Sequence, residues 1–184
     1  VTGQETTKDA SQATDYLIGD ALPSFYGGLG TSLSFYGFDF SINLNYQLGG
    51  KAYDYTYQTL MHSSGTTATT WHTDILKAWS PENTNTNIPR LRFAETYSQN
   101  PRSDRFITNA SYLNIQNINL GYTLPASITQ KYNIQNIRVY FSGENLFYFS
   151  ARRGFDPRYT LKGYSNPELY SPKRTISGGI SFTF

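Results

Sequence analysis

The fold is decided by residues 38–48, which read FDFSINLNYQL. Every even position from Phe38 to Leu48 is apolar or aromatic, and every odd position from Asp39 to Gln47 is polar. A period of two is typical of a β-strand with one apolar and one polar face, whereas a helix repeats every 3.6 residues. The length matches the roughly 9–11 residues that a tilted strand needs to cross a bilayer. We therefore predict a strand here that can span a membrane.

The same alternation recurs, less regularly, in four further segments. We predict these strands at about 25–35, 110–124, 135–148 and 173–184. Tyr36-Gly37 is expected to form a tight hairpin turn between the first two strands, because glycine readily supplies a positive φ. Within 110–124 the apolar parity slips near Gln116-Asn117, which predicts a β-bulge.

The connections between the predicted strands alternate in length. Those at 36–37 and 125–134 are short, whereas 49–109 and 149–172 are long. Membrane barrels have short periplasmic turns and long extracellular loops. We therefore expect extracellular loops at 49–109 and 149–172 and a periplasmic C-terminus. Residues 1–24 would end another extracellular loop, and residues 25–184 would be the C-terminal strands of a barrel.

Composition excludes several classes of protein. Aromatic residues make up 16% of the chain and charged residues only 15%, against roughly 25% charged in typical domains. The absence of cysteine excludes disulfide frameworks and thiolate metal sites. The net charge is +2 and the Lys and Arg residues are scattered, so no nucleic acid partner is expected. Residues 1–5 carry no leader, which suggests processing or a start within a longer polypeptide.

The predicted strands cannot form a closed barrel alone, since the smallest closed forms have about eight. An open sheet would leave unpaired edges in hydrocarbon, where each unsatisfied backbone group costs several kcal/mol. The sequence therefore predicts an all-β chain that forms the last strands, about five, of a larger transmembrane antiparallel β-barrel. Either the rest of the same barrel or other chains must supply the remaining strands.

An ordered set of short motifs resembles one known family. The motifs are PSFYGGLGT at 23–31, GFDFS at 37–41, QLGGK at 47–51, ASYL at 110–113, LGYTLP at 120–125, SGENLF at 142–147, FDPR at 155–158 and RTISGGI at 174–180. Together they resemble the SusC/RagA-type TonB-dependent outer-membrane transporters. The likeness covers roughly residues 15–184.

This resemblance implies a barrel of about 22 strands filled by an N-terminal plug. It also implies a TonB-contacting segment outside this chain and a SusD-like surface lipoprotein that covers the barrel. Such transporters import oligosaccharides or peptides across the Gram-negative outer membrane, without a cofactor and without enzymatic activity. The alternative is a passive porin, or a structural or secretion barrel with a similar wall. The presence of an upstream plug would decide between them.

Two groups of residues are candidates for contacts with other molecules. Substrate or partner contacts in the long loops are expected from Trp71, Trp79, Tyr97, Phe155, Arg158 and Tyr159. For the aromatic residues among them, the alternative is that they pack the loops against themselves. The last strand, with apolar Ile176, Ile180, Phe182 and Phe184 on one face, resembles the signal that the barrel-assembly machinery recognises. Thr73–Trp79 reads as a short helix capped by Thr73 and stopped by Pro81.

The sequence gives little support to catalytic or metal chemistry. His62 and His72 are the two histidines of the chain, and a metal site needs about three or four converging ligands. The acidic residues other than Glu144 that could form a hydrolytic pair lie in long loops, where solvated carboxylates are ordinary. We expect Glu144 to pair with an interior cation such as Arg138, or to contact the plug.

Overall fold

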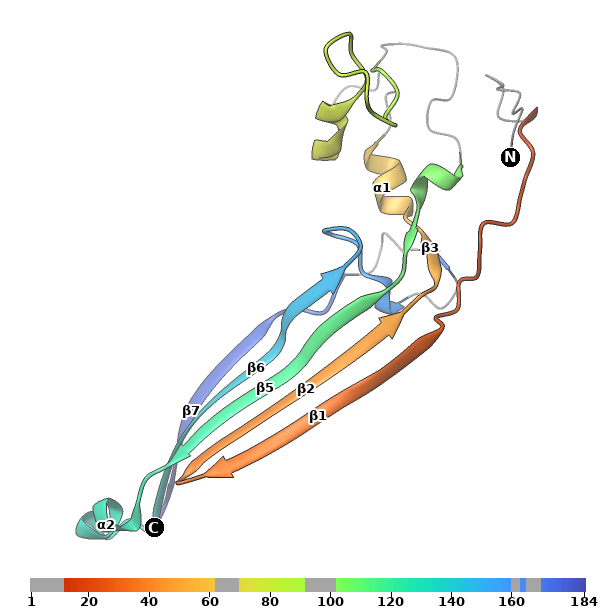
Figure 1. Cartoon of the computed structure of the whole chain (residues 1–184). Helices are drawn as coiled ribbons and strands as arrows, with labels where there is room; N and C mark the ends of the chain where they lie inside the picture. The colour runs from red at the N-terminus through yellow and green to blue at the C-terminus, as the bar shows by residue number, and fades with distance from the viewer. Residues whose placement is uncertain (1–11, 62–69, 92–101, 160–162, 165–169) are drawn as a thin grey trace.

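The computed structural model describes residues 12–61, 70–91, 102–159, 163–164 and 170–184 (Figure 1). Its main feature is a long antiparallel sheet of five strands in the order β1-β2-β5-β6-β7. The strands run over Phe25–Phe35, Phe38–Leu48, Tyr112–Thr123, Asn136–Ser150 and Thr175–Thr183, in that order. The first two have the bounds expected from the alternation, and the other three differ from expectation by one or two residues at their ends.

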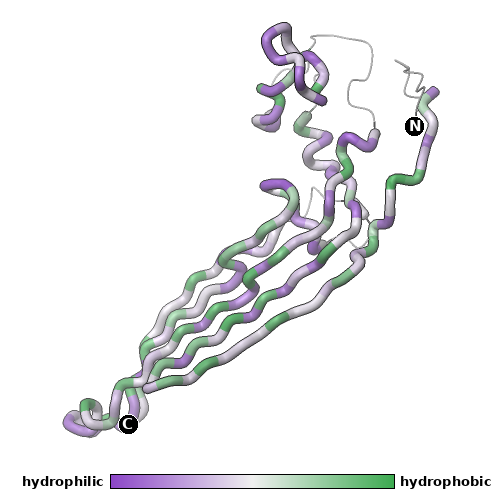
Figure 2. Tube along the Cα trace, viewed as in Figure 1, coloured by the Kyte–Doolittle hydropathy of each residue, from purple (hydrophilic) through white to green (hydrophobic). Residues whose placement is uncertain are grey.

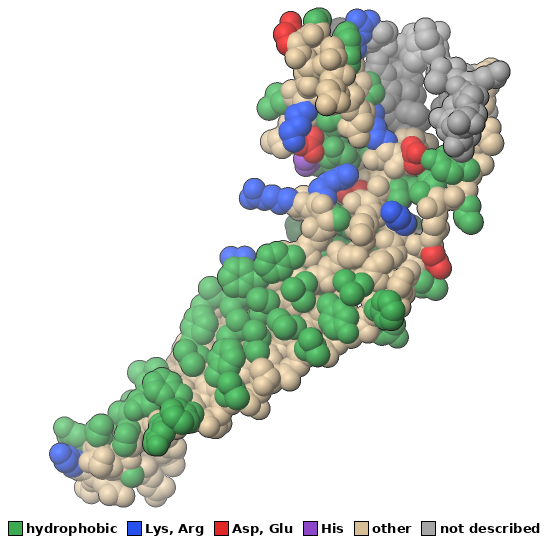
Figure 3. Space-filling model, in the orientation of Figure 1, with side chains coloured by type: hydrophobic (Ala, Val, Ile, Leu, Met, Phe, Trp, Pro, Cys, Tyr) green, Lys and Arg blue, Asp and Glu red, His purple; other side chains and the backbone are tan. Residues whose placement is uncertain are grey.

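The strand register sorts the side chains into two unlike faces. One row across the sheet joins Leu33, Phe40, Leu120 and Phe141. The next row joins Ser32, Ser41, Asn119, Ser142 and Ser177. The alternating colours of Figure 2 follow this pattern along each strand, and Figure 3 shows apolar side chains gathered over the sheet.

No second layer covers the apolar face in the described part of the chain. Phe38 is 52% exposed, and Leu33 and Ile180 are more than half exposed. A single sheet whose apolar side chains remain open is unlike the core of a water-soluble domain, in which such groups are buried. The apolar face therefore requires a non-aqueous environment.

The turn and the bulge expected from the sequence are both present. Tyr36 and Gly37 have φ of 46° and 83°, so both turn residues have positive φ, as a two-residue hairpin with a type I′ turn requires. Gln116 lies outside the strand pairing, because Ile115 pairs with Phe147 while Asn117 pairs with Glu144. The predicted bulge is confirmed.

The long connection after β2 folds into a structure of its own above the sheet (Figure 1). The short strands β3 (Lys51–Tyr53) and β4 (Ile107–Asn109) pair with each other, and helix α1 (Tyr55–Leu60) follows β3. A small core holds this region together; its members are Tyr53, Met61, Ile75, Ile88 and Phe106. The connection is therefore a packed cap in its described part, with the short helix η3 (Asp104–Phe106) leading into β4.

The helix expected at Thr73–Trp79 is shorter than predicted and has a different cap. It is a 3₁₀ helix, η2 (Thr73–Lys77), whose N-cap is His72 rather than Thr73. The His72 Nδ1 atom accepts a hydrogen bond of 3.1 Å from the Asp74 backbone N–H. Trp79 lies beyond the helix, because its backbone N–H donates to the Ile88 carbonyl.

The opposite end of the sheet carries the short elements between β5 and β6. These are α2 (Ala126–Thr129) and η4 (Gln130–Tyr132), and they lie beside the C-terminus (Figure 1). The remaining element, η5 (Pro157–Tyr159), belongs to the connection between β6 and β7. None of the helices in the described ranges is long and apolar enough to span a membrane.

An ion pair crosses the polar face near this same end. Arg138 of β6 donates from Nε to Asp39 Oδ1 of β2 over 3.2 Å, and its Nη2 contacts the other carboxylate oxygen. The strand between them contributes Gly121, where a Cβ atom would collide with both charged groups. The expectation that Arg138 pairs with Glu144 is wrong. Arg138 and Glu144 are six residues apart on one strand, a separation of about 20 Å.

Gly121→Ala should disturb this ion pair, because the added methyl group occupies the space that the Arg138 and Asp39 side chains share. We expect a lower midpoint of urea unfolding in detergent-solubilised protein. Gly178→Ala is the matched control, since its nearest neighbour would lie 3.5 Å away. Equal midpoints for the two variants would contradict a role for the close approach at residue 121.

Candidate functional site

A concave basin opens on the polar face of the sheet between β2, β5, β6 and the connection that follows β6. Its volume is about 680 Å³, and its lining consists of Asn43, Asn45, Asn114, Gln116, Asn117, Glu144, Asn145, Arg158 and Pro172. Six of these nine residues carry a carboxamide. We call this site the carboxamide basin.

The bulge creates the basin by placing consecutive side chains on one face. In a regular strand, neighbours point to opposite sides, but Gln116 and Asn117 both line the basin. Opposite them on β6, Glu144 and Asn145 also both line it, because Asn145 has a φ of 50° and lies outside the pairing. Asparagine tolerates this left-handed conformation better than most residues do. The irregularity therefore concentrates polar groups at one point of the wall.

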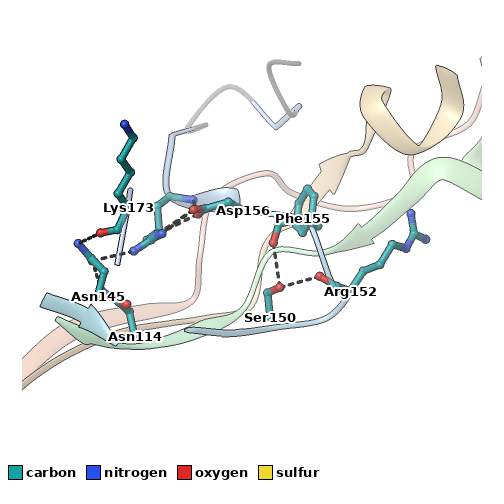
Figure 4. Close-up of polar contacts among 8 residues, drawn as sticks. Asn114, Asn145, Ser150, Arg152, Phe155, Asp156 and Lys173 are labelled. Atoms are coloured by element: carbon teal, nitrogen blue, oxygen red, sulfur yellow. Dashed lines mark hydrogen bonds and ion pairs between the residues drawn. The ribbon is translucent and has the colours of Figure 1, made fainter. Parts of the chain in front are cut away.

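Arg158 lines the basin, and contacts on two sides hold its guanidinium group in place. Its Nε atom donates to Asp156 Oδ1 over 2.9 Å and lies 3.1 Å from Oδ2. Its guanidinium carbon lies 4.4 Å from the centre of the Tyr148 ring. The Arg158 Nη1 atom lies 3.4 Å from Asn145 Oδ1, so the ion pair between Arg158 and Asp156 connects directly to the basin. Dashed lines in Figure 4 mark the contacts that Asp156 and Asn145 make.

The charge of Asp156 is stabilised despite its burial. Burial alone would raise the pKa of this carboxyl group, but hydrogen bonds from the Arg158 side chain and backbone outweigh it. The net result is a pKa below the ordinary aspartate value. Asp156 therefore stays ionised at neutral pH, and Arg158 keeps its partner.

A second contact ties the connection after β6 to the cap. Arg152 Nη1 lies 3.1 Å from Asp54 Oδ2, and the Arg152 guanidinium stacks 3.6 Å from the centre of the Tyr57 ring. Phe155 is 3% exposed and clusters with Ala52 and Ala110 at the base of the cap. The two long connections consequently form one packed rim beside the basin.

The described residues among those that the sequence predicts for substrate or partner contacts do not form one site. Arg158 lines the basin. Trp71 and Trp79 are 42% and 40% exposed and belong to the cap, and Phe155 is buried, which leaves its ring little surface for a ligand. Tyr97 and the side chain of Tyr159 lie outside the described residues, as does His62. Within the residues that the structure describes, no three His, Asp or Glu side chains converge as metal ligands.

Sequence reasoning missed the basin's carboxamides. Asn43 and Asn45 stand at odd positions of the segment that decides the fold, and Asn114, Gln116 and Asn117 surround the parity slip. The signal was present, because carboxamides are crowded at the point where the alternation breaks. Recognising the site also required the register that brings β2, β5 and β6 together.

Known proteins with related sequences are similar to nearly all of the chain. It is 33% identical over 186 residues to TonB-dependent receptor P3 of Formosa agariphila, a match that covers 96% of this chain and 18% of the relative. It is 30% identical over 158 residues to TonB-dependent receptor SusC of Bacteroides thetaiotaomicron, covering 85% of this chain and 15% of the relative. No family model matches the sequence.

A solved structure is similar as well. In the RagAB peptide importer in its "closed-closed" state, one chain matches with a TM-score of 0.72 and 25% sequence identity. The match covers 100% of this chain and 21% of that one. This chain therefore corresponds to a small part of much longer relatives.

A two-faced antiparallel sheet with this similarity defines a wall segment of an outer-membrane β-barrel protein. The chain belongs to the SusC/RagA-type family of TonB-dependent outer-membrane transporters. Its relatives are named as receptors and transporters, which points against an enzymatic activity.

Asp156→Asn should loosen the wall around Arg158, because a neutral amide replaces the carboxylate that holds a largely buried guanidinium. We expect backbone amide exchange around residues 150–158 to accelerate about ten- to a hundredfold, equivalent to about 1–3 kcal/mol of local stability. Hydrogen exchange with mass spectrometry measures this. Asp15→Asn, at an exposed position, is the matched control.

The same ion pair has a defined pH dependence. Because the folded-state pKa of Asp156 is lowered, its contribution is complete at neutral pH and is lost as the pH falls below about 4. After correction for intrinsic rates, exchange in the unsubstituted protein should rise in that range, and the Asp156→Asn variant should show no such step. An equal acid step in both proteins would contradict the assignment.

Proposed function

We propose that this chain forms part of the wall of a TonB-driven importer of oligosaccharides or peptides in the outer membrane. A SusD-like surface lipoprotein would cover its extracellular mouth, and parts of the polypeptide outside this chain would supply the plug and the contact with TonB. One observation carries the proposal: the chain that forms this single-layer, two-faced sheet matches the sequence of TonB-dependent receptor P3 over 96% of its length.

The geometry supports a definite orientation in the membrane. The apolar face would contact lipid and the polar face, with the carboxamide basin, would line the interior. The outer edges of β1 and β7 would pair with the rest of the same barrel, because an open edge in hydrocarbon is costly. The cap would be extracellular, and α2 and the C-terminus would be periplasmic.

Exposed side chains on the cap and in the last strand are consistent with the contacts expected with substrate, lipoprotein and assembly machinery. Trp71 and Trp79 on the cap, with Tyr97 and Tyr159, remain candidates for contact with substrate or the lipoprotein. In the last strand and at the C-terminus, Ile176, Ile180, Phe182 and Phe184 are each more than half exposed. This accessibility supports their role as the segment that the barrel-assembly machinery recognises.

Ile42→Arg should impair membrane insertion far more than Ser32→Arg. Ile42 lies on the apolar face near the middle of β2, whereas Ser32 lies on the polar face one row away. An arginine in the middle of the lipid-facing surface costs about 2–4 kcal/mol, while the same residue facing a wet interior costs little. The fraction of folded barrel, measured by heat-modifiable migration in gels, reports the difference. Similar folded fractions would contradict the proposed lipid face.

Disruption of the gene should abolish uptake of at least one class of labelled oligosaccharide or peptide in the host bacterium. Loss of TonB or addition of a protonophore should have the same effect, because import against a gradient needs energy. Complementation with the intact gene is the control. Uptake that persists without TonB would indicate a passive barrel, and unchanged uptake of every substrate after disruption would reject the importer.

A further inference from the structure

We infer that the carboxamide basin binds neutral, hydroxyl-rich saccharide units. This inference rests on the proposed import function and chooses between its two substrate classes. The basin has a size typical of small-molecule sites, about 680 Å³. It also lies beside the cap and the connection after β6, where cargo arriving from outside would first meet the wall.

The inner layer of the basin is preorganised. The Asn114 side chain is 1% exposed and lies 3.4 Å from Asn145 Oδ1, which also faces Arg158 Nη1. Asn145 in turn reaches the backbone carbonyl of Lys173. These contacts fix the floor and upper wall without a ligand, so binding would cost little ordering.

The outer layer presents free polar groups. Asn43, Gln116 and Glu144 are exposed and line the basin, and their side chains make no hydrogen bond with other described residues. A carboxamide offers two donor hydrogens and an acceptor oxygen, and a sugar hydroxyl likewise donates and accepts. Adjacent hydroxyl groups on a sugar ring can therefore pair with this array.

The residues that line the basin disfavour peptides, the other proposed substrate class. Pro172 is its one apolar residue, so the basin lacks the apolar surface that would hold leucine or phenylalanine side chains of a peptide. Among the lining residues, Arg158 is paired with Asp156, and Glu144 is the other charged side chain. Acidic sugars and acidic peptides are therefore disfavoured relative to neutral saccharides.

The test uses the full-length transporter purified in detergent. It is incubated with three probe pools: neutral oligosaccharides and acidic oligosaccharides from partially hydrolysed polysaccharides, and tryptic peptides of casein. Native mass spectrometry records which molecules remain bound. We expect retention of neutral oligosaccharides and at least a tenfold loss of that retention in the Asn43→Leu/Gln116→Leu variant. Asn136→Leu, an exposed asparagine at the far end of β6, is the matched control and should leave retention unchanged.

The other outcomes overturn the inference. Retention of peptides or acidic sugars alone rejects the ligand class, and failure to retain any pool rejects binding. Equal retention by the double variant places the saccharide site elsewhere. Faster hydrogen exchange in the plug of the unliganded double variant, with retention unchanged, would show that the basin contacts the plug instead. In all these cases TonB-dependent uptake in cells shows separately whether the import function stands.

Discussion

Backbone hydrogen bonding within the sheet is the constraint on which the rest of this structure depends. In hydrocarbon no water is available to pair with an amide or a carbonyl, so the backbone N–H and C=O groups of each strand must form hydrogen bonds with the neighbouring strands. The register from β1 to β7 does so internally and leaves unpaired groups at the two outer edges. Because side chains alternate between the two faces of each strand, the same pairing also separates lipid-facing from interior-facing side chains. Strict alternation in 38–48 is the sequence consequence of that separation.

Irregular backbone is concentrated where the polar face can satisfy it. The bulge at Gln116 and the left-handed Asn145 interrupt the pairing of β5 and β6, and both side chains point into the carboxamide basin. At this point the Asn145 side chain contacts Arg158 Nη1 and the Lys173 carbonyl. The feature that weakens the ladder is therefore also the one that builds a binding surface, a common association of bulges with functional positions.

Prediction from sequence succeeded where a single strand carried the information and failed where partners were distant. The alternation located β2, and the parity slip located the bulge, because both are local. The partner of Arg138 was missed since Asp39 is 99 residues away and is reached only across β5 and over Gly121. Asn145, opposite the bulge on β6, was missed for the same reason, since its place in the basin depends on the register. Packing of the long loop against itself was one of the two alternatives for its aromatic residues, but the members of the core could not be named, because they come from positions between Tyr53 and Phe106.

The position of the basin on strands rather than on loop tips has consequences for transport. Groups carried by a paired sheet hold their geometry more closely than groups on a mobile loop, so the site can select by hydroxyl pattern. Each hydrogen bond to a neutral hydroxyl exchanges with water and contributes only about 0.5–1.5 kcal/mol. A wall of such contacts would hold cargo specifically but release it one contact at a time. An importer needs that balance, because a ligand bound too tightly at the mouth would not move inward.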